Sequence, residues 1–115
     1  MERLEKQQFI RRIAAENQTD AAGSRVYWSR HAILEMVKDD LIRPEIEQAL
    51  WQGEIIEDYP AGHRLLPDCL VLAFLPDGRP LHAVIAIDVN KDRIFMITVY
   101  LPSSERWQND WRTRK

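Results

Sequence analysis

The chain has 115 residues, of which 45% are apolar and 30% are charged. These values fit one globular domain with one hydrophobic core, and they exclude an intrinsically disordered chain. No apolar run approaches the roughly 20 residues that a membrane helix requires. With 16 basic and 18 acidic residues the net charge is −2, which does not favour a nucleic-acid partner on charge alone.

The cysteine count and the N-terminus bear on the cellular compartment. Cys69 is the only cysteine, so it cannot form an internal disulfide, which agrees with a reducing compartment. The first residues are charged and lack the apolar core of a signal peptide. We therefore expect a cytoplasmic protein without a membrane segment.

Hydrophobic periodicity predicts three helices in the first half of the chain. The first spans residues 2–16 and, with a linker to residue 23, precedes an α+β domain of residues 24–115. A short strand at residues 26–28 leads to Ser29, the expected N-cap of a helix over residues 30–40. Pro44 and Gly53 bound the third helix. The expected buried residues are Leu4, Ile10, Ile13 and Ala14, then Ala32, Ile33, Met36 and Val37, then Ile46, Ala49 and Leu50.

The second half of the chain has the pattern of strands at residues 54–59, 69–75, 81–89 and 94–100. Short turns separate them, and such turns join antiparallel hairpins. The predicted fold class is α+β, with helices packed on one face of an antiparallel sheet of about four strands. Ser103 is the expected N-cap of a C-terminal helix through Trp107 and Trp111.

One register of the hairpin formed by residues 81–89 and 94–100 places only apolar side chains on one face and a mixed set on the other. With Val89 opposite Arg93, one sheet face is purely apolar, whereas a slip of one residue mixes the two sets. We expect the helices to cover that apolar face, which contains Leu81, Ala83, Ile85, Ile87, Phe95, Ile97 and Val99. The same register places His82 directly opposite Tyr100 on the other face, near Thr98.

The residues that commonly bind metals or phosphates are scattered. His31, His63, His82 and Cys69 show no ligand-like spacing. The glycines at positions 23, 53, 62 and 78 form no phosphate cradle. We expect neither a metal nor a cofactor.

The face with His82 and Tyr100 has the residue types of a metal-independent RNA-cleaving site. Such cleavage needs a base for the 2′-hydroxyl, an acid for the leaving oxygen and cations for the charged transition state. His82 and Tyr100 are the acid–base candidates, and Glu57 is a further candidate base. The candidates for substrate binding are Arg79, Lys91 and Arg93 at strand ends and His31 in the first turn of a helix. The opposing interpretation is that His82 and Tyr100 form a cross-strand pair that only stabilises the sheet.

The end of the chain is locally basic. Residues 101–115 contain Arg106, Arg112, Arg114 and Lys115 against Glu105 and Asp110. This stretch has the positive character that the whole chain lacks.

Four sequence blocks occur in an order that resembles a bacterial family. They are Trp28-Ser-Arg-His-Ala with Met36, the run from Gly53 to Pro60, Gly78-Arg-Pro-Leu-His82, and the run from Ile97 to Tyr100 before Pro102. Over residues 26–111 they resemble the family called domain of unknown function 4258. That family is similar to the RelE, BrnT and MqsR toxins, which implies a RelE-like two-layer fold, mRNA cleavage and an antitoxin partner. The matching motif positions are Ser29, His31, Glu57, Tyr59, Arg79, His82, Thr98 and Tyr100.

Two hypotheses follow for the function. The first is a toxin-like, metal-independent endoribonuclease of a bacterial toxin–antitoxin pair, with RNA as its substrate and an antitoxin as its partner. The alternative is a non-catalytic protein-interaction domain, which includes the case of a homodimer. It uses the same sheet face together with Trp107 and Trp111 to hold its partner. The alternative predicts that Arg79 and Arg93 point away from His82.

Overall fold

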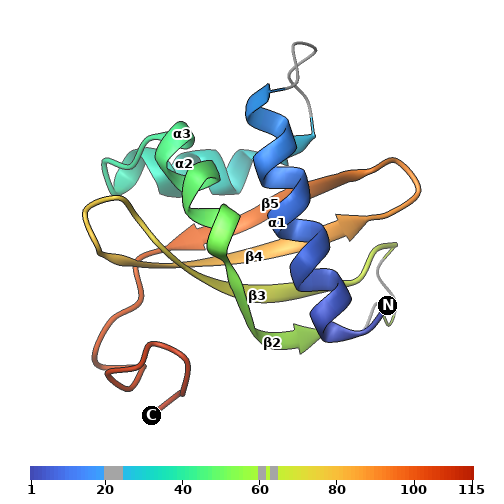
Figure 1. The fold of residues 1–115 in the computed structure, drawn as a ribbon. Coiled ribbons are helices and arrows are strands. Elements are labelled where there is room, and N and C mark those ends of the chain that lie inside the picture. The colour runs from blue at the N-terminus through green and yellow to red at the C-terminus, as the bar shows by residue number, and fades with distance from the viewer. Residues whose placement is uncertain (20–24, 60–61, 63–64) are drawn as a thin grey trace.

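The computed structural model describes residues 1–19, 25–59, 62 and 65–115, and it confirms the α+β class (Figure 1). Among these residues, no helix is long and apolar enough to cross a membrane. The elements in chain order are α1 (Arg3–Thr19), β1 (Val26–Trp28), α2 (Arg30–Lys38), α3 (Arg43–Ala49), the 3₁₀ turn η1 (Leu50–Gln52), β2 (Glu54–Tyr59), β3 (Asp68–Phe74), β4 (Pro80–Asp88) and β5 (Arg93–Tyr100).

The strands form one mixed sheet in the order β1-β5-β4-β3-β2. Neighbours from β2 to β5 are antiparallel, as predicted. β1 adds a fifth strand, which pairs with β5 in parallel and places Val26 opposite Ile94. The expectation of about four strands, all antiparallel, is therefore incomplete, because the local pattern identifies β1 as a strand but says nothing about its neighbour.

A β-bulge in β5 changes the predicted faces of the last hairpin. The predicted register holds near His82, which pairs with Tyr100, but it shifts by one residue in the middle of the hairpin. An extra residue in one strand inverts the alternation of side chains beyond it. The assignment of Phe95 and Ile97 to the core face is therefore wrong. Beyond the shift the fully buried residues are Ile94 and Met96, whereas the half-buried ones are Phe95 and Ile97.

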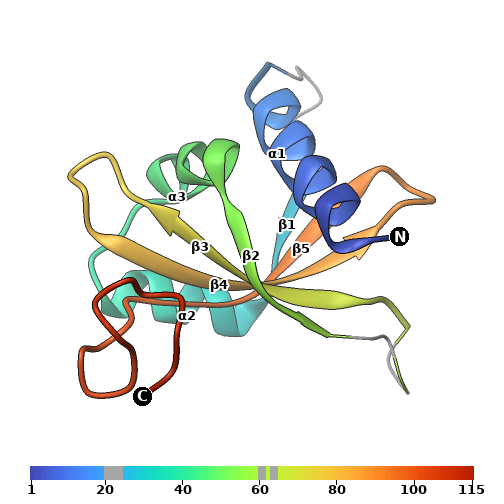
Figure 2. The ribbon, with the colours of Figure 1, turned by 60° about the horizontal axis from the view of Figure 1, so that its bottom comes forward.

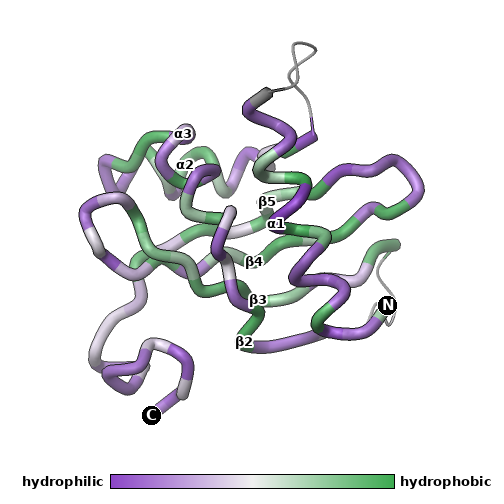
Figure 3. The backbone as a smooth tube through the Cα atoms, viewed as in Figure 1, coloured by the Kyte–Doolittle hydropathy of each residue, from purple (hydrophilic) through white to green (hydrophobic). Residues whose placement is uncertain are grey.

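The main core lies between the sheet and the layer formed by α1, α3 and η1 (Figures 1 and 2). Figure 3 shows that the strands beneath these helices are strongly hydrophobic. The helical layer contributes residues at helical spacing. The buried ones include the predicted Ile10, Ile13, Ala14, Ile46, Ala49 and Leu50. Leu4, which was expected among them, is exposed.

Side chains of α1 also bind the backbone of the edge strand β2. Arg3 donates a hydrogen bond to the carbonyl of Ile55, and the Gln7 side chain accepts one from the Ile55 N–H. Arg11 donates to the Gly53 carbonyl at 2.8 Å. The outward-facing polar groups at this point of the strand are therefore satisfied within the molecule.

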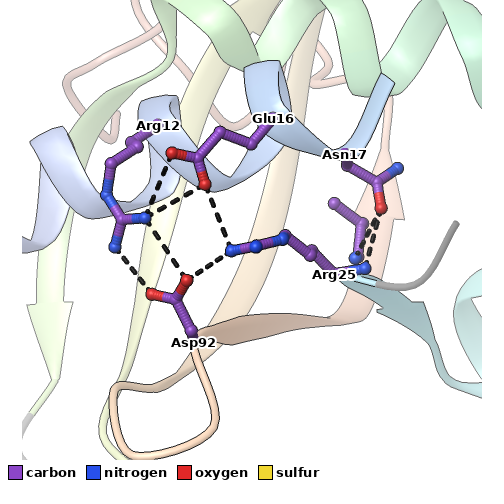
Figure 4. Close-up of polar contacts among 6 residues, drawn as sticks. Arg12, Glu16, Asn17, Arg25 and Asp92 are labelled. Atoms are coloured by element: carbon purple, nitrogen blue, oxygen red, sulfur yellow. Dashed lines mark hydrogen bonds and ion pairs between the residues drawn. The ribbon is translucent and has the colours of Figure 1, made fainter. Parts of the chain in front are cut away.

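A polar cluster joins α1 to the turn between β4 and β5 and to the start of β1 (Figure 4). Asp92 in the turn accepts hydrogen bonds from Arg12 and Arg25, and Glu16 accepts from the same two arginines. The neighbouring guanidinium groups hold the pKa of Asp92 below its usual range. Asn17 Oδ1 accepts from the Arg25 backbone N–H at 2.8 Å. Since these carboxylates join arginines of separate elements, we interpret the cluster as an attachment of α1.

α2 begins at the predicted cap. Ser29 Oγ accepts a hydrogen bond from the Ala32 N–H at 3.0 Å and donates one to the Ile97 carbonyl at 2.9 Å. The hydroxyl therefore joins the start of the helix to the bulged part of β5. In Figure 2 the helix lies on the side of the sheet away from α1 and α3. The expectation that all helices cover one face is therefore wrong.

The inward face of α2 is narrower than predicted. Ala32 is buried and Met36 is partly buried against the core, whereas Ile33 and Val37 are exposed. The expectation that Ile33 and Val37 are buried is wrong, because this short helix packs along one strand and buries only one row of side chains. The outward row remains apolar.

The predicted C-terminal helix does not form. Residues 102–115, called the C-terminal segment below, contain turns and one isolated bridge between Trp107 and Arg114. The Asp110 side chain accepts hydrogen bonds from the N–H groups of Arg112 and Thr113, which reverses the chain. Trp111 follows with a φ of 60°. Such local side-chain bonds compete with helix formation.

Candidate functional site

The C-terminal segment covers the sheet face opposite α1 and α3 (Figure 2). Its Trp107 is 3% exposed and lies edge-on to the His82 ring, with 4.4 Å between ring centroids. In the sheet His82 pairs with Leu72, which is also buried but lies outside the main core cluster. The segment therefore creates a second, smaller buried region centred on His82.

Two arginines of the segment bind carboxylates of β2. Arg112 contacts Glu54 at 2.9 Å, and Arg114 contacts the two oxygens of Glu57 at 2.7 and 2.9 Å. These bonds lower the pKa of both glutamates. The Tyr59 hydroxyl also donates to Glu57, and burial together with this bond raises the pKa of Tyr59 to about 12. Glu57, a predicted catalytic base, is thus an ionised carboxylate that holds the C-terminal segment.

His82 is fully buried, and both of its ring nitrogens are engaged. Nε2 lies 2.8 Å from the carbonyl oxygen of Trp111, and Nδ1 lies 3.1 Å from the hydroxyl of Tyr100. A carbonyl can only accept a hydrogen bond, so Nε2 carries the proton. In the neutral ring Nδ1 is then the acceptor, and Tyr100 donates to it. The predicted pairing of His82 with Tyr100 is confirmed by the strand register.

Burial tunes both members of this pair toward their neutral forms. It lowers the pKa of His82, although the bond to the Trp111 carbonyl acts in the opposite direction. It raises the pKa of Tyr100; the charge of Arg114 acts in the opposite direction, and the charge of Glu57 raises the pKa further. At neutral pH the pair is therefore an uncharged imidazole that accepts a hydrogen bond from an uncharged phenol.

Tyr100 also lines a cavity of about 360 Å³ between the end of β5 and the C-terminal segment. The other lining residues are Leu101, Ser103, Arg106, Trp107 and Arg114. Arg106 forms no ion pair with any part of the chain that the structure describes. The cavity is therefore lined by a tyrosine, a serine and two arginines.

The cations that were predicted to bind substrate lie elsewhere. Arg79 binds Asp77 at 2.8 Å in the turn between β3 and β4, and Arg93 binds Asp88 at 2.9 Å. The Asp88–Arg93 pair is six residues along β4 from His82, or about 20 Å away. Lys91 belongs to the turn at that same distant end. None of these three residues lines the cavity.

His31 is on the exposed side of α2. Its Nε2 lies 3.0 Å from Glu35, and Glu35 also accepts a hydrogen bond from the Val99 N–H at 3.3 Å. His31 is thus joined to the end of β5 through Glu35, but it does not line the cavity.

No metal site is found among the described residues, since no three of their His, Cys, Asp or Glu side chains lie where they could hold one ion together. His63, weighed as a ligand above, lies outside the described residues.

The comparison with protein families identifies the central part of the chain. A model described as a domain of unknown function, DUF4258, matches residues 28–101. The chain belongs to the DUF4258 family. No curated protein and no solved structure matches it. The RelE-like resemblance remains a prediction.

The DUF4258 match includes only part of the candidate site. His82, Tyr100 and Glu57 lie within it, whereas the cavity residues Arg106 and Arg114 follow its end. Sequence reasoning found the basic character of this tail but did not place it beside Tyr100. The excess of arginine in the tail was a usable signal. The path of a segment without regular structure, however, cannot be predicted from its composition.

Proposed function

We propose that this DUF4258 protein is a toxin-like, metal-independent endoribonuclease that acts on RNA in the cytoplasm and is paired with an antitoxin. One observation carries the proposal. Tyr100 lines a cavity together with two arginines, and its hydroxyl lies 3.1 Å from the buried, neutral His82. That combination supplies a proton acceptor and cations at one place, which phosphodiester cleavage by the 2′-hydroxyl requires.

In the proposed reaction Tyr100 contacts the 2′-hydroxyl of the bound RNA. Tyr100 takes the proton of that hydroxyl and passes its own proton to His82 Nδ1. The 2′-oxygen forms a bond to the adjacent phosphorus while the bond to the 5′-oxygen of the next nucleotide breaks. That oxygen takes a proton from water, and the imidazolium later releases its proton to solvent. The products are a 2′,3′-cyclic phosphate and a free 5′-hydroxyl.

Arg106 and Arg114 are the proposed phosphate-binding residues, in place of Arg79 and Arg93. Arg114 is positioned by its two bonds to Glu57, whereas Arg106 has no such carboxylate among the described residues and is available to an anion. Charge develops on the phosphate oxygens in the transition state, where guanidinium groups stabilise it. This local site explains how a chain with a net charge of −2 could still bind a phosphodiester.

The test compares two matched substitutions in a cleavage assay with end-labelled single-stranded RNA and EDTA. Tyr100→Phe removes the hydroxyl that contacts His82, and we expect it to lower the rate by about 100-fold or more. Tyr27→Phe removes a hydroxyl on β1, a strand that does not line the cavity, so it serves as the control. Equal rates for Tyr100→Phe and the unmodified protein, or an absence of cleavage by the folded protein, contradict the proposal.

Expression in bacteria provides the second readout. The unmodified chain is expected to arrest growth and degrade RNA, and co-expression of the protein encoded beside it is expected to relieve the arrest. Tyr100→Phe is expected to allow growth. Arrest that persists in this variant would show that toxicity does not come from the proposed chemistry.

A non-catalytic interaction domain is the second candidate, and a specific observation favours it. Arg79 and Arg93 bind their own neighbouring carboxylates and lie away from the cavity. In that reading the Tyr100–His82 pair stabilises the sheet and fixes the C-terminal segment through the Trp111 carbonyl. The RNA assay separates the two candidates, because only the first predicts a cleaved product.

A further inference from the structure

Helix α2 presents an apolar row to solvent. Ile33 is 41% exposed, Leu34 is 60% exposed and Val37 is 62% exposed. Residues spaced by three or four positions share one side of a helix, so these three side chains form a continuous stripe. The buried row of the same helix, with Ala32, faces the core instead. An exposed apolar helix face of this kind is typical of a surface that binds another protein.

Two cations lie on the same side as this stripe. At 3.6 residues per turn, Arg30, Lys38 and the stripe fall within about 140° of the helix circumference. Arg30 and Lys38 are exposed, and neither forms an ion pair or side-chain hydrogen bond with the described residues. They flank the stripe at its two ends. The surface is therefore apolar along its middle and positive at both ends.

The acidic groups near α2 do not neutralise this surface. Glu35 is the only acidic residue within the helix, and it binds His31 and the Val99 N–H. Asp39 is the C-cap and lies about 180° around the axis from Arg30. The two cations therefore remain available to carboxylates from outside the molecule.

The charges also distinguish between two kinds of occupant. If two copies pack α2 against α2 in antiparallel order, Arg30 of each copy approaches Lys38 of the other. In parallel order Arg30 approaches Arg30. Both arrangements place like charges together at the ends of the contact, which opposes self-association. A partner with carboxylates beside an apolar row avoids this repulsion and gains two ion pairs.

We infer that the stripe of Ile33, Leu34 and Val37, with Arg30 and Lys38 at its ends, docks an acidic amphipathic helix of a partner protein. The partner helix places its apolar row on the stripe and its Asp or Glu side chains against the two cations. The surface is separate from the proposed reaction, because no residue of α2 lines the cavity beside Tyr100.

A labelled synthetic peptide tests the inference by fluorescence anisotropy at physiological salt. The peptide is a helix with leucines at positions i, i+3, i+4 and i+7 and glutamates on both borders, and a second peptide has lysines in place of the glutamates. We expect the full chain to bind the acidic peptide at least tenfold more tightly than the basic one. Sedimentation of the free chain is expected to show no dimer that forms through α2.

Three variants sharpen the test. Leu34→Ser combined with Val37→Ser is expected to weaken binding of the acidic peptide at least tenfold, whereas Leu4→Ser, at an exposed leucine of α1, is expected to leave it unchanged. Arg30→Glu combined with Lys38→Glu is expected to reverse the preference toward the basic peptide. All five substituted positions are exposed, and circular dichroism checks that each variant folds.

Several outcomes would overturn the inference. They are an acidic peptide that does not bind, binding that ignores the serine substitutions, a preference that the charge reversal leaves unchanged, and a dimer that the serine substitutions dissociate. RNA cleavage by the same variants is measured in parallel. Peptide binding lost with cleavage retained would separate this surface from the proposed reaction.

Discussion

Two regions flank the part of the chain that matches the DUF4258 family, and they are attached in different ways. α1 precedes residues 28–101 and the C-terminal segment follows them. α1 buries Phe9, Ile10, Ile13 and Ala14 in the main core. The C-terminal segment buries only Pro102 and Trp107 among the described residues, and it is also held by the largely exposed ion pairs of Arg112 and Arg114 and a hydrogen bond to His82.

This difference separates a region that builds the fold from one that covers a site. Burial of several apolar side chains couples α1 to global unfolding. Exposed ion pairs contribute little each, so the C-terminal segment can detach while the sheet and α1 remain folded. Detachment would uncover His82 and change the walls of the cavity beside Tyr100. The comparison therefore predicts global effects for changes in α1 and local effects for changes in the segment.

The largest effect is expected from Ile13→Ala in α1. Ile13 is fully buried, and removal of its side chain leaves a cavity between α1 and the sheet. We expect the free energy of unfolding to fall by about 3 kcal/mol, measured by urea denaturation. Leu4→Ala, at an exposed position of the same helix, is the control. A loss below about 1 kcal/mol would show that α1 is not part of the cooperative core.

Trp107→Ala is expected to have a smaller effect on global stability and a larger one on the C-terminal segment. The free energy of unfolding should fall by about 2 kcal/mol, because a segment without regular structure can move away and does not preserve a cavity. Trypsin should then cleave faster at Arg106, Arg112 and Arg114, and mass spectrometry identifies the products. Cleavage of the variant at the same rate as the unmodified protein would mean that the ion pairs alone hold the C-terminal segment.

Asp92→Asn tests the ionic attachment of α1 shown in Figure 4. Asp92 binds both Arg12 and Arg25, but it is substantially exposed. We therefore expect a loss of only about 0.5 kcal/mol, which should disappear in 1 M salt because of screening. Urea denaturation at low and high salt measures it. A loss that does not depend on salt would point to a role for Asp92 in the turn conformation, where its φ is 55°.

The smallest effect is a pH-dependent release of the C-terminal segment. Burial lowers the pKa of His82 from the ordinary 6.5, so its contribution to stability is complete above pH 6.5 and decreases as the pH falls toward the lowered value. The pKa values of Glu54 and Glu57 are lowered from 4.5, so their ion pairs are lost at still lower pH. NMR titration of the His82 ring and the Trp107 indole follows both steps. His82→Gln should remove only the first, and an unchanged profile would contradict the assignment.

Local sequence patterns predicted much of the fold, because helix caps and strand alternation depend on residues that are close in sequence. Ser29 caps α2 as expected, and the alternation of β4 placed His82 opposite Tyr100. The bulge in β5 was not predictable from alternation, because one inserted residue leaves no mark in an apolar run. The basic tail predicted positive charge, but its position beside Tyr100 depends on turns made by Asp110 and on the ion pairs with β2.

The bonds from α1 to the Ile55 backbone have a consequence for behaviour at high concentration. The sheet has two edges, and β2 is the longer edge strand, whereas β1 has only three residues. A free strand edge is a template on which another chain can add and start aggregation. Because Arg3 and Gln7 already occupy the Ile55 carbonyl and N–H, an incoming strand finds these groups blocked. α1 therefore acts as a built-in protection against intermolecular sheet growth as well as a part of the core.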